Sequence, residues 1–189
     1  MDFRNVLVRF LEELKRNKSP VISFLNDGIA EQEALALFSR INISPPKCLL
    51  DLYTWKNGLY SENINANYLL FGARGIFSPL EISTHLYVLD IEEEIYPKYL
   101  FPLFFDSTYL INIDPLSKSF NMIYYYSPSL GMSHPITIYD SLSKMFHTYI
   151  ECFQKKAFFY DENKYFTEII DDVEIISKSL NPKSEYWKQ

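Results

Sequence analysis

Three histidines, His85, His134 and His147, are the side chains best suited to acid–base or metal chemistry in this chain of 189 residues. His147 and Glu151 lie four residues apart on a predicted helix, a spacing that can present two metal ligands. A zinc site needs three or four ligands, and the neighbouring Cys152 lies on another face, so we interpret the two as a surface pair. No HExxH, paired CxxC or GxSxG motif is present, and no nucleophile or orienting carboxylate lies near His134. We therefore predict no catalytic residue, no metal site and no cofactor, and we expect the protein not to be an enzyme.

The carboxylates that could bind a partner fall into two short acidic runs. The denser run occupies residues 90–94 near the expected end of a helix, and the second occupies residues 171–174. Such a run is ordinarily a solvated helix end, and the alternative is a docking edge for a basic protein. The candidate partner-binding residues are Asp90, Glu92, Glu93, Glu94, Asp171 and Asp172.

The net charge of the chain is −6. An acidic chain repels the phosphates of nucleic acids, which argues against direct DNA or RNA binding. The run Tyr124, Tyr125 and Tyr126 could stack on bases, but no basic residues are interleaved with it, and ordinary sheet packing explains it. The same charge would attract a basic protein partner, or would simply keep the protein in solution.

The longest apolar run, residues 99–105, is far too short to cross a bilayer, so we expect no membrane association. The residues after Met1 lead into a charged helix and not into the apolar core of a signal peptide. Cys48 and Cys152 both lie among apolar neighbours, as buried thiols of a reducing compartment do. These features predict a cytoplasmic protein.

Hydrophobic periodicity predicts helices at both ends of the chain and strands between them. Helices are expected near residues 2–17, 29–40, 44–57, 78–94, 141–153 and 161–180, and strands near 68–71, 100–105, 109–113, 120–126 and 136–139. Pro102 indicates that its strand is an edge or carries a bulge. The order of helices, strands and helices predicts an α+β fold. We expect a single domain over residues 1–189, with a largely antiparallel or mixed sheet flanked by N-terminal and C-terminal helices.

Local signals predict where several helices begin and end. Ser44, Ser78 and Ser141 are expected N-caps, because a hydroxyl oxygen can accept a hydrogen bond from a free N–H group of the first turn. A proline follows both Ser44 and Ser78, at a position where its missing N–H group costs nothing. Asn57 and Gly58 are expected to close the helix that begins at Ser44, because both residues tolerate the left-handed conformation.

The residues from Pro46 to Gly58 resemble the most recognisable motif of the SUKH superfamily, through Tyr53, Trp55 and the Asn57-Gly58 pair. Residues 100–104, 112–114 and 141–153 resemble later segments of that family in the same order. Residues 180–187 resemble the end of some bacterial members. The chain departs from the family pattern at Pro45, where a leucine is frequent, and in its long segment 60–67.

The resemblance implies a mixed α+β fold without a known active site or cofactor. It also implies a bacterial immunity protein that binds and neutralises a cognate polymorphic toxin, often a nuclease. The alternative is an intracellular interaction or scaffold protein without a toxin partner, as the cell-wall-assembly regulators of the Smi/Knr type suggest. A third alternative is an enzyme whose site the sequence motifs do not reveal; a deep pocket lined by perturbed carboxylates would favour it.

Overall fold

The computed structural model describes residues 2–59, 65–72, 75–106 and 108–188. Over these residues the chain forms the helices α1 (Phe3–Arg16), α2 (Glu31–Arg40), α3 (Lys47–Trp55), α4 (Leu80–Glu92), α5 (Leu142–Gln154) and α6 (Ile170–Leu180). The strands are β1 (Leu25–Asp27), β2 (Lys56–Leu59), β3 (Leu100–Pro102), β4 (Tyr109–Asn112), β5 (Ile123–Tyr125), β6 (Ile136–Tyr139), β7 (Phe158–Tyr160) and β8 (Phe166–Glu168). Single 3-10 turns are η1 (Pro20–Phe24), η2 (Ala66–Tyr68), η3 (Pro128–Leu130) and η4 (Tyr186–Lys188).

Strands β3 to β6 form one antiparallel sheet, in which each strand pairs with the next along the chain. The pairs β1–β2 and β7–β8 form two further antiparallel sheets of their own. Pro102 lies on β3 at the edge of the larger sheet, as its missing N–H group predicted. The predicted α+β fold, with antiparallel strands flanked by N-terminal and C-terminal helices, is confirmed.

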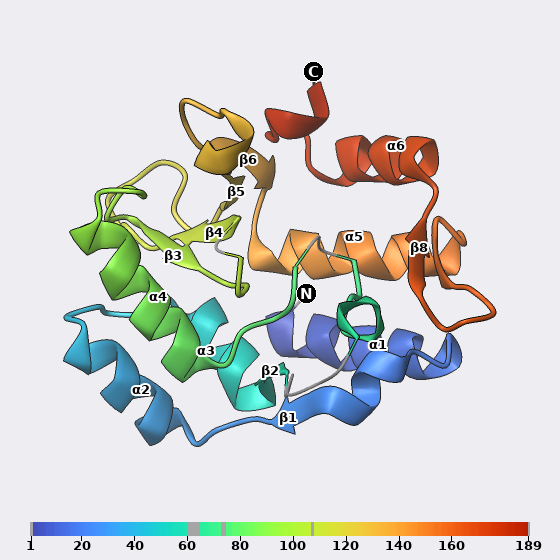
Figure 1. The fold of residues 1–189 in the computed structure, drawn as a ribbon, viewed down its shortest axis with the longest axis horizontal. Helices are drawn as coiled ribbons and strands as arrows, with labels where there is room; N and C mark the ends of the chain where they lie inside the picture. The colour runs from blue at the N-terminus through green and yellow to red at the C-terminus, as the bar shows by residue number, and fades with distance from the viewer. Residues whose placement is uncertain (1, 60–64, 73–74, 107, 189) are drawn as a thin grey trace.

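Helix α5 runs through the middle of the molecule, with α1 packed on one side and α6 on the other (Figure 1). Helices α2, α3 and α4 form a second group beside α1, and α4 also packs against β3 (Figure 1). Ser141 begins α5 as predicted, because its hydroxyl oxygen accepts a hydrogen bond of 3.1 Å from the Lys144 N–H group. The N-terminal helix α1 therefore packs against a helix that begins only at Leu142.

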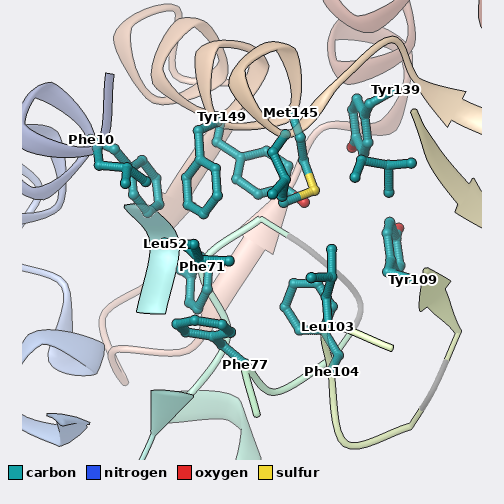
Figure 2. Packing of buried hydrophobic residues seen from close by; sticks show 14 of the residues in the cluster. Phe10, Leu52, Phe71, Phe77, Leu103, Phe104, Tyr109, Tyr139, Met145 and Tyr149 are labelled. Carbon is teal, nitrogen blue, oxygen red and sulfur yellow. The ribbon is translucent and has the colours of Figure 1, made fainter. Parts of the chain in front are cut away.

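The core is built largely from aromatic rings, in keeping with an aromatic content of 17%. One row of rings leads from α1 to β4 through Phe10, Phe71, Phe77, Phe104 and Tyr109 (Figure 2). Neighbouring ring centroids in this row lie 5.5–6.4 Å apart and the rings are inclined to one another, which is the favourable geometry for aromatic pairs. The row joins the N-terminal helix to the four-stranded sheet.

The prediction of a strand at residues 68–71 was wrong. Residues 66–68 form the turn η2, and Leu69 and Phe71 are buried beyond it without strand pairing. A short apolar run has no period that distinguishes a strand from a buried loop. Here the side chains insert into the core without a neighbouring backbone to pair with.

The prediction of one helix over residues 161–180 was wrong in its first half. Residues 158–168 form the hairpin β7–β8, and α6 begins at Ile170. The Asp161 carboxylate accepts hydrogen bonds from the Asn163 and Tyr165 N–H groups, which folds the chain into a turn. The ring centroids of Phe166 and Phe158 lie 5.0 Å apart, a contact that is made because the hairpin brings β8 back beside β7.

Two of the expected caps were also wrong. Helix α3 begins at Lys47 without a side-chain cap, and Ser78 does not cap α4. The cap of α4 is Asn57, whose Oδ1 accepts a hydrogen bond of 2.9 Å from the Leu80 N–H group. Gly58 follows on β2 with φ +70°, and a Cβ atom there would lie 2.2 Å from the Pro79 nitrogen. The Asn57-Gly58 pair therefore supports the start of α4 and does not close α3, contrary to the prediction.

Candidate protein-binding surface

The acidic run predicted from the sequence lies at the C-terminal end of α4. Glu92 is the last residue of the helix, Glu93 is its C-cap, and Glu94 follows; all three side chains are exposed, whereas Asp90 is half-buried. The Glu94 N–H group donates a hydrogen bond to the Ile91 carbonyl, and the Ile95 N–H group donates one of 2.8 Å to the Asp90 carbonyl. This pair of bonds closes the helix and holds Glu94 in the left-handed conformation, with φ +55°.

This placement opposes the electrostatics of the helix. The free carbonyl groups at a helix C-terminus carry about half a negative charge, so an acidic side chain there costs ~0.3–1 kcal/mol at low salt. The left-handed conformation adds a further cost of about 1 kcal/mol for any residue with a Cβ atom. Among the described residues none forms an ion pair with Glu92, Glu93 or Glu94. The fold itself therefore gives no reason for three carboxylates at this end.

Three other helices provide an internal comparison. Helices α1, α2 and α5 also end with a left-handed residue immediately after the C-cap, with φ between 52° and 61°. The residues at that position are Lys18, Asn42 and Lys156. A lysine favours the negative helix end, and asparagine tolerates the backbone conformation. In the part of the chain that the structure describes, α4 thus stands apart in placing a glutamate there.

The second predicted run occupies a different place. Asp171 and Asp172 are exposed in the first turn of α6, next to the free N–H groups of the helix start. Acidic side chains at that end are stabilising, so the fold accounts for them without a partner. Figure 1 places α4 and α6 on opposite sides of the molecule, so the two predicted runs do not form one patch.

A hollow of about 410 Å³ adjoins the end of α4. It is lined by Glu94, by Tyr126 of the tyrosine run noted in the sequence, and by Tyr96, which the sequence did not single out. The rings of Tyr96 and Tyr126 meet edge to face with their centroids 5.5 Å apart. Burial, together with the charges of Asp90 and Asp106, raises the pKa of Tyr96 to about 12, so its phenol stays neutral at physiological pH. Tyrosine is enriched among the residues that contribute most to protein–protein binding, and Lys98 lines the hollow beside the two rings.

The three histidines lie on separate elements: His85 on α4, His134 in the loop before β6 and His147 on α5. His147 Nε2 lies 3.8 Å from Glu151 Oε1, and burial lowers the pKa of His147, against the attraction of Glu151. His134 is exposed beside Ser133 on the same hollow as Tyr126. Within the described ranges, no three His, Cys, Asp or Glu side chains gather as metal ligands would.

No helix in the described part of the chain combines the length and the apolar character needed to span a membrane. No known family model matches the sequence, and no curated protein matches it either.

Proposed function

We propose that this protein binds a basic protein partner through the acidic end of α4, and that the partner is a toxin which the complex neutralises. The observation that carries the proposal is the left-handed glutamate at the negative end of α4, where the other comparable helices have lysine or asparagine. Residues that lower stability are retained where function requires them. The resemblance to the SUKH superfamily supports the choice of a toxin as partner.

In this proposal the carboxylates of Glu92, Glu93 and Glu94 speed the encounter with a positively charged surface. A nuclease toxin has such a surface, because it must hold the phosphates of its substrate. Tyr96 and Tyr126 then provide the apolar contact area, and an apolar or basic side chain of the toxin fills the hollow between them. Inhibition follows from occupying the surface that the nucleic acid would otherwise reach.

A direct test takes a candidate toxin from the genes that neighbour this one and measures its affinity for this protein, by calorimetry at two salt concentrations. The triple variant Glu92→Gln, Glu93→Gln and Glu94→Gln should weaken binding by about tenfold or more at low salt, mainly through slower association. The matched control is Asp171→Asn with Asp172→Asn, which removes acidic charge from α6 and should leave the affinity within about twofold. Equal losses in the two variants, or no complex with the unmodified protein, would refute the proposal.

The scaffold alternative predicts a different outcome in the same experiment. A scaffold would use the same acidic surface, but its basic partner would keep its activity in the complex. An assay of the toxin's activity with increasing amounts of this protein therefore distinguishes the two. Complete inhibition at a one-to-one ratio is expected for an immunity protein.

A further inference from the structure

A groove of about 420 Å³ lies between α2 and α4, two helices that lie side by side (Figure 1). Its lining includes apolar side chains from both helices: Leu37 and Ile41 of α2, and Ile82 and Val88 of α4. None of these four side chains is fully buried, so the groove presents apolar surface to solvent. A contiguous apolar surface on a protein of this size commonly marks a place where another molecule binds.

Helix α4 is apolar on its solvent side as well as on its core side. Leu80 and Tyr87 are buried toward the core, whereas Ile82 and Leu89 are 37% and 39% exposed. Steps of three and four residues along a helix keep to one face, so Ile82, His85 and Leu89 form a single outer stripe. A helix that is apolar all round is ordinarily buried on every side. The outer stripe therefore has the composition of a helix face that packs against another element.

Exposed carboxylates lie at both ends of this stripe. Glu81 precedes Ile82, and Glu92 follows Leu89 by less than one turn. Glu81 and Glu92 are 11 positions apart, which corresponds to ~16 Å along the helix axis. Arg40 of α2 is the one lysine or arginine among the described residues that line the groove, and neither Arg40 nor Glu81 forms an ion pair with another described residue. The surface is thus apolar in the middle and acidic at its two ends.

This charge pattern argues against a second copy of the same chain as the occupant. If two copies packed α4 against α4 in opposite directions, Glu81 of each copy would meet Glu92 of the other. If the two helices ran in the same direction, each glutamate would meet its own equivalent. Both arrangements bring like charges together, in a chain whose net charge is already −6. Charge complementarity therefore requires a basic occupant.

We propose that the groove between α2 and α4 holds an amphipathic helix of the basic partner. Apolar side chains of that helix, spaced at i, i+3 and i+7, lie against Ile82 and Leu89, and a lysine or arginine at each end faces Glu81 or Glu92. About three helical turns span the distance between the two glutamates. The inference deepens the proposed function and rests on it for the identity of the partner, because Glu92 belongs to both surfaces.

The probe is a synthetic peptide of about 14 residues of lysine, alanine and leucine, with leucines along one helical face and lysines in its first and last turns. Its binding to the full-length protein is measured by fluorescence anisotropy at low salt. A second peptide has the same composition, with its leucines distributed around the helix. Saturable one-to-one binding of the first peptide, about tenfold tighter than that of the second, is expected. Equal binding of the two peptides, or no saturable binding of the first, overturns the proposal.

Variants place the binding in the groove. Ile82→Gln with Leu89→Gln should weaken binding of the first peptide by about tenfold or more, because both apolar contacts are lost. The matched control is Ile170→Gln with Ile175→Gln, which makes the same changes at exposed positions of α6. A loss in this control as large as in the groove variant would overturn the assignment.

A further variant removes charge without removing apolar surface. Glu81→Gln should weaken binding at least about threefold at low salt, and Glu162→Gln, on the exposed turn of the β7–β8 hairpin, should leave it unchanged. Equal affinities of these two variants would contradict the role of Glu81. Sedimentation equilibrium of the protein alone tests the other occupant: a dimer that Ile82→Gln with Leu89→Gln abolishes would assign the groove to a second copy and overturn the proposal.

The candidate toxin separates this inference from the proposed function. If the toxin loses affinity for the variant in which Glu92, Glu93 and Glu94 are all glutamine, but not for Ile82→Gln with Leu89→Gln, the proposed function stands and the groove proposal fails. If the basic peptide binds in the groove and no toxin forms a complex, the groove proposal stands and the toxin proposal fails. Loss of toxin affinity in both variants supports the two together.

Discussion

Replacing Glu94 with lysine should stabilise the protein, although the side chain at this position is exposed to solvent. The substitution removes an acidic group from the negative end of α4 and supplies the basic residue that α1 and α5 carry at the same position, Lys18 and Lys156. Both residues have a Cβ atom, so the backbone cost of the left-handed conformation is unchanged. The comparison therefore isolates the interaction of the side-chain charge with the helix end.

The expected gain follows from the two halves of the change. Removing the acid recovers ~0.3–1 kcal/mol, and adding the base gains a similar amount, so the free energy of unfolding should rise by about 0.6–2 kcal/mol at low salt. For a domain of this size the melting temperature should rise by about 1–8 °C. The reciprocal variant Lys156→Glu should lower stability by a comparable amount, because it places an acid at the end of α5.

The assay is urea unfolding at about 20 mM and at 1 M sodium chloride, where the Debye length falls to ~3 Å and the effect should largely vanish. Glu162→Lys is the control for net charge, since it makes the same change on the exposed turn of the β7–β8 hairpin. The reasoning is refuted if Glu94→Lys is neutral or destabilising at low salt, or if Glu162→Lys stabilises as much. A stabilised Glu94→Lys protein that no longer binds its partner would link the lost stability to function.

Three further expectations concern the fold. Asp51→Asn should destabilise by about 1–3 kcal/mol at pH 7, because the buried carboxylate accepts hydrogen bonds from two basic side chains. Burial opposes ionisation, but those bonds lower the pKa of Asp51. The stability that the Asp51 carboxylate contributes is therefore fully present above the ordinary aspartate pKa near 4, and it is lost as the pH falls through the lowered pKa. In urea unfolding, the Asp51→Asn variant should therefore lose less stability on acidification than the unmodified protein does. Gly58→Ala should lower the stability measured by thermal unfolding by about 2 kcal/mol or more, whereas Gly131→Ala should lower it by only about 1 kcal/mol. The two glycines have similar positive φ, but no atom lies within 4 Å of a Cβ atom added at Gly131. Burial raises the pKa of both Cys48 and Cys152 to about 12, so neither thiol should react with iodoacetamide at pH 8 until urea is added; rapid alkylation of the native protein would contradict this.

Elements with local signals could be predicted from the sequence. The cap at Ser141, the hairpin of β4 and β5 and the edge position of Pro102 each depend on residues a few positions apart. The cap of α4 could not be predicted, because Asn57 and the Leu80 N–H group that it binds are 23 positions apart. Local patterns assigned the cap to Ser78 because they contain no information about which chain segments meet in space.

The candidate surfaces were also only partly predictable from the sequence. The acidic run at Glu92–Glu94 is visible in the sequence, but its unfavourable position at the negative end of α4 could be recognised only once the last residue of that helix was known. A cavity of about 170 Å³ is assembled from residues of β4, β6, β8, α6 and η4, and no spacing within the chain indicates that Tyr109 and Trp187 line one cavity. Single aromatic residues in strands are ordinary, so the sequence offered no reason to select these.

The packing of α1 on α5 has a consequence for synthesis on the ribosome. Phe3 and Phe10 of α1 contact the ring of Phe146, and Phe10 also contacts Tyr149, so the first helix completes its core only with residues near 150. At ~5–20 residues per second, the apolar face of α1 waits on the order of ten seconds after emergence for its partner. The apolar face of α1 is exposed during that time, so shorter fragments that lack α5 should aggregate when expressed alone.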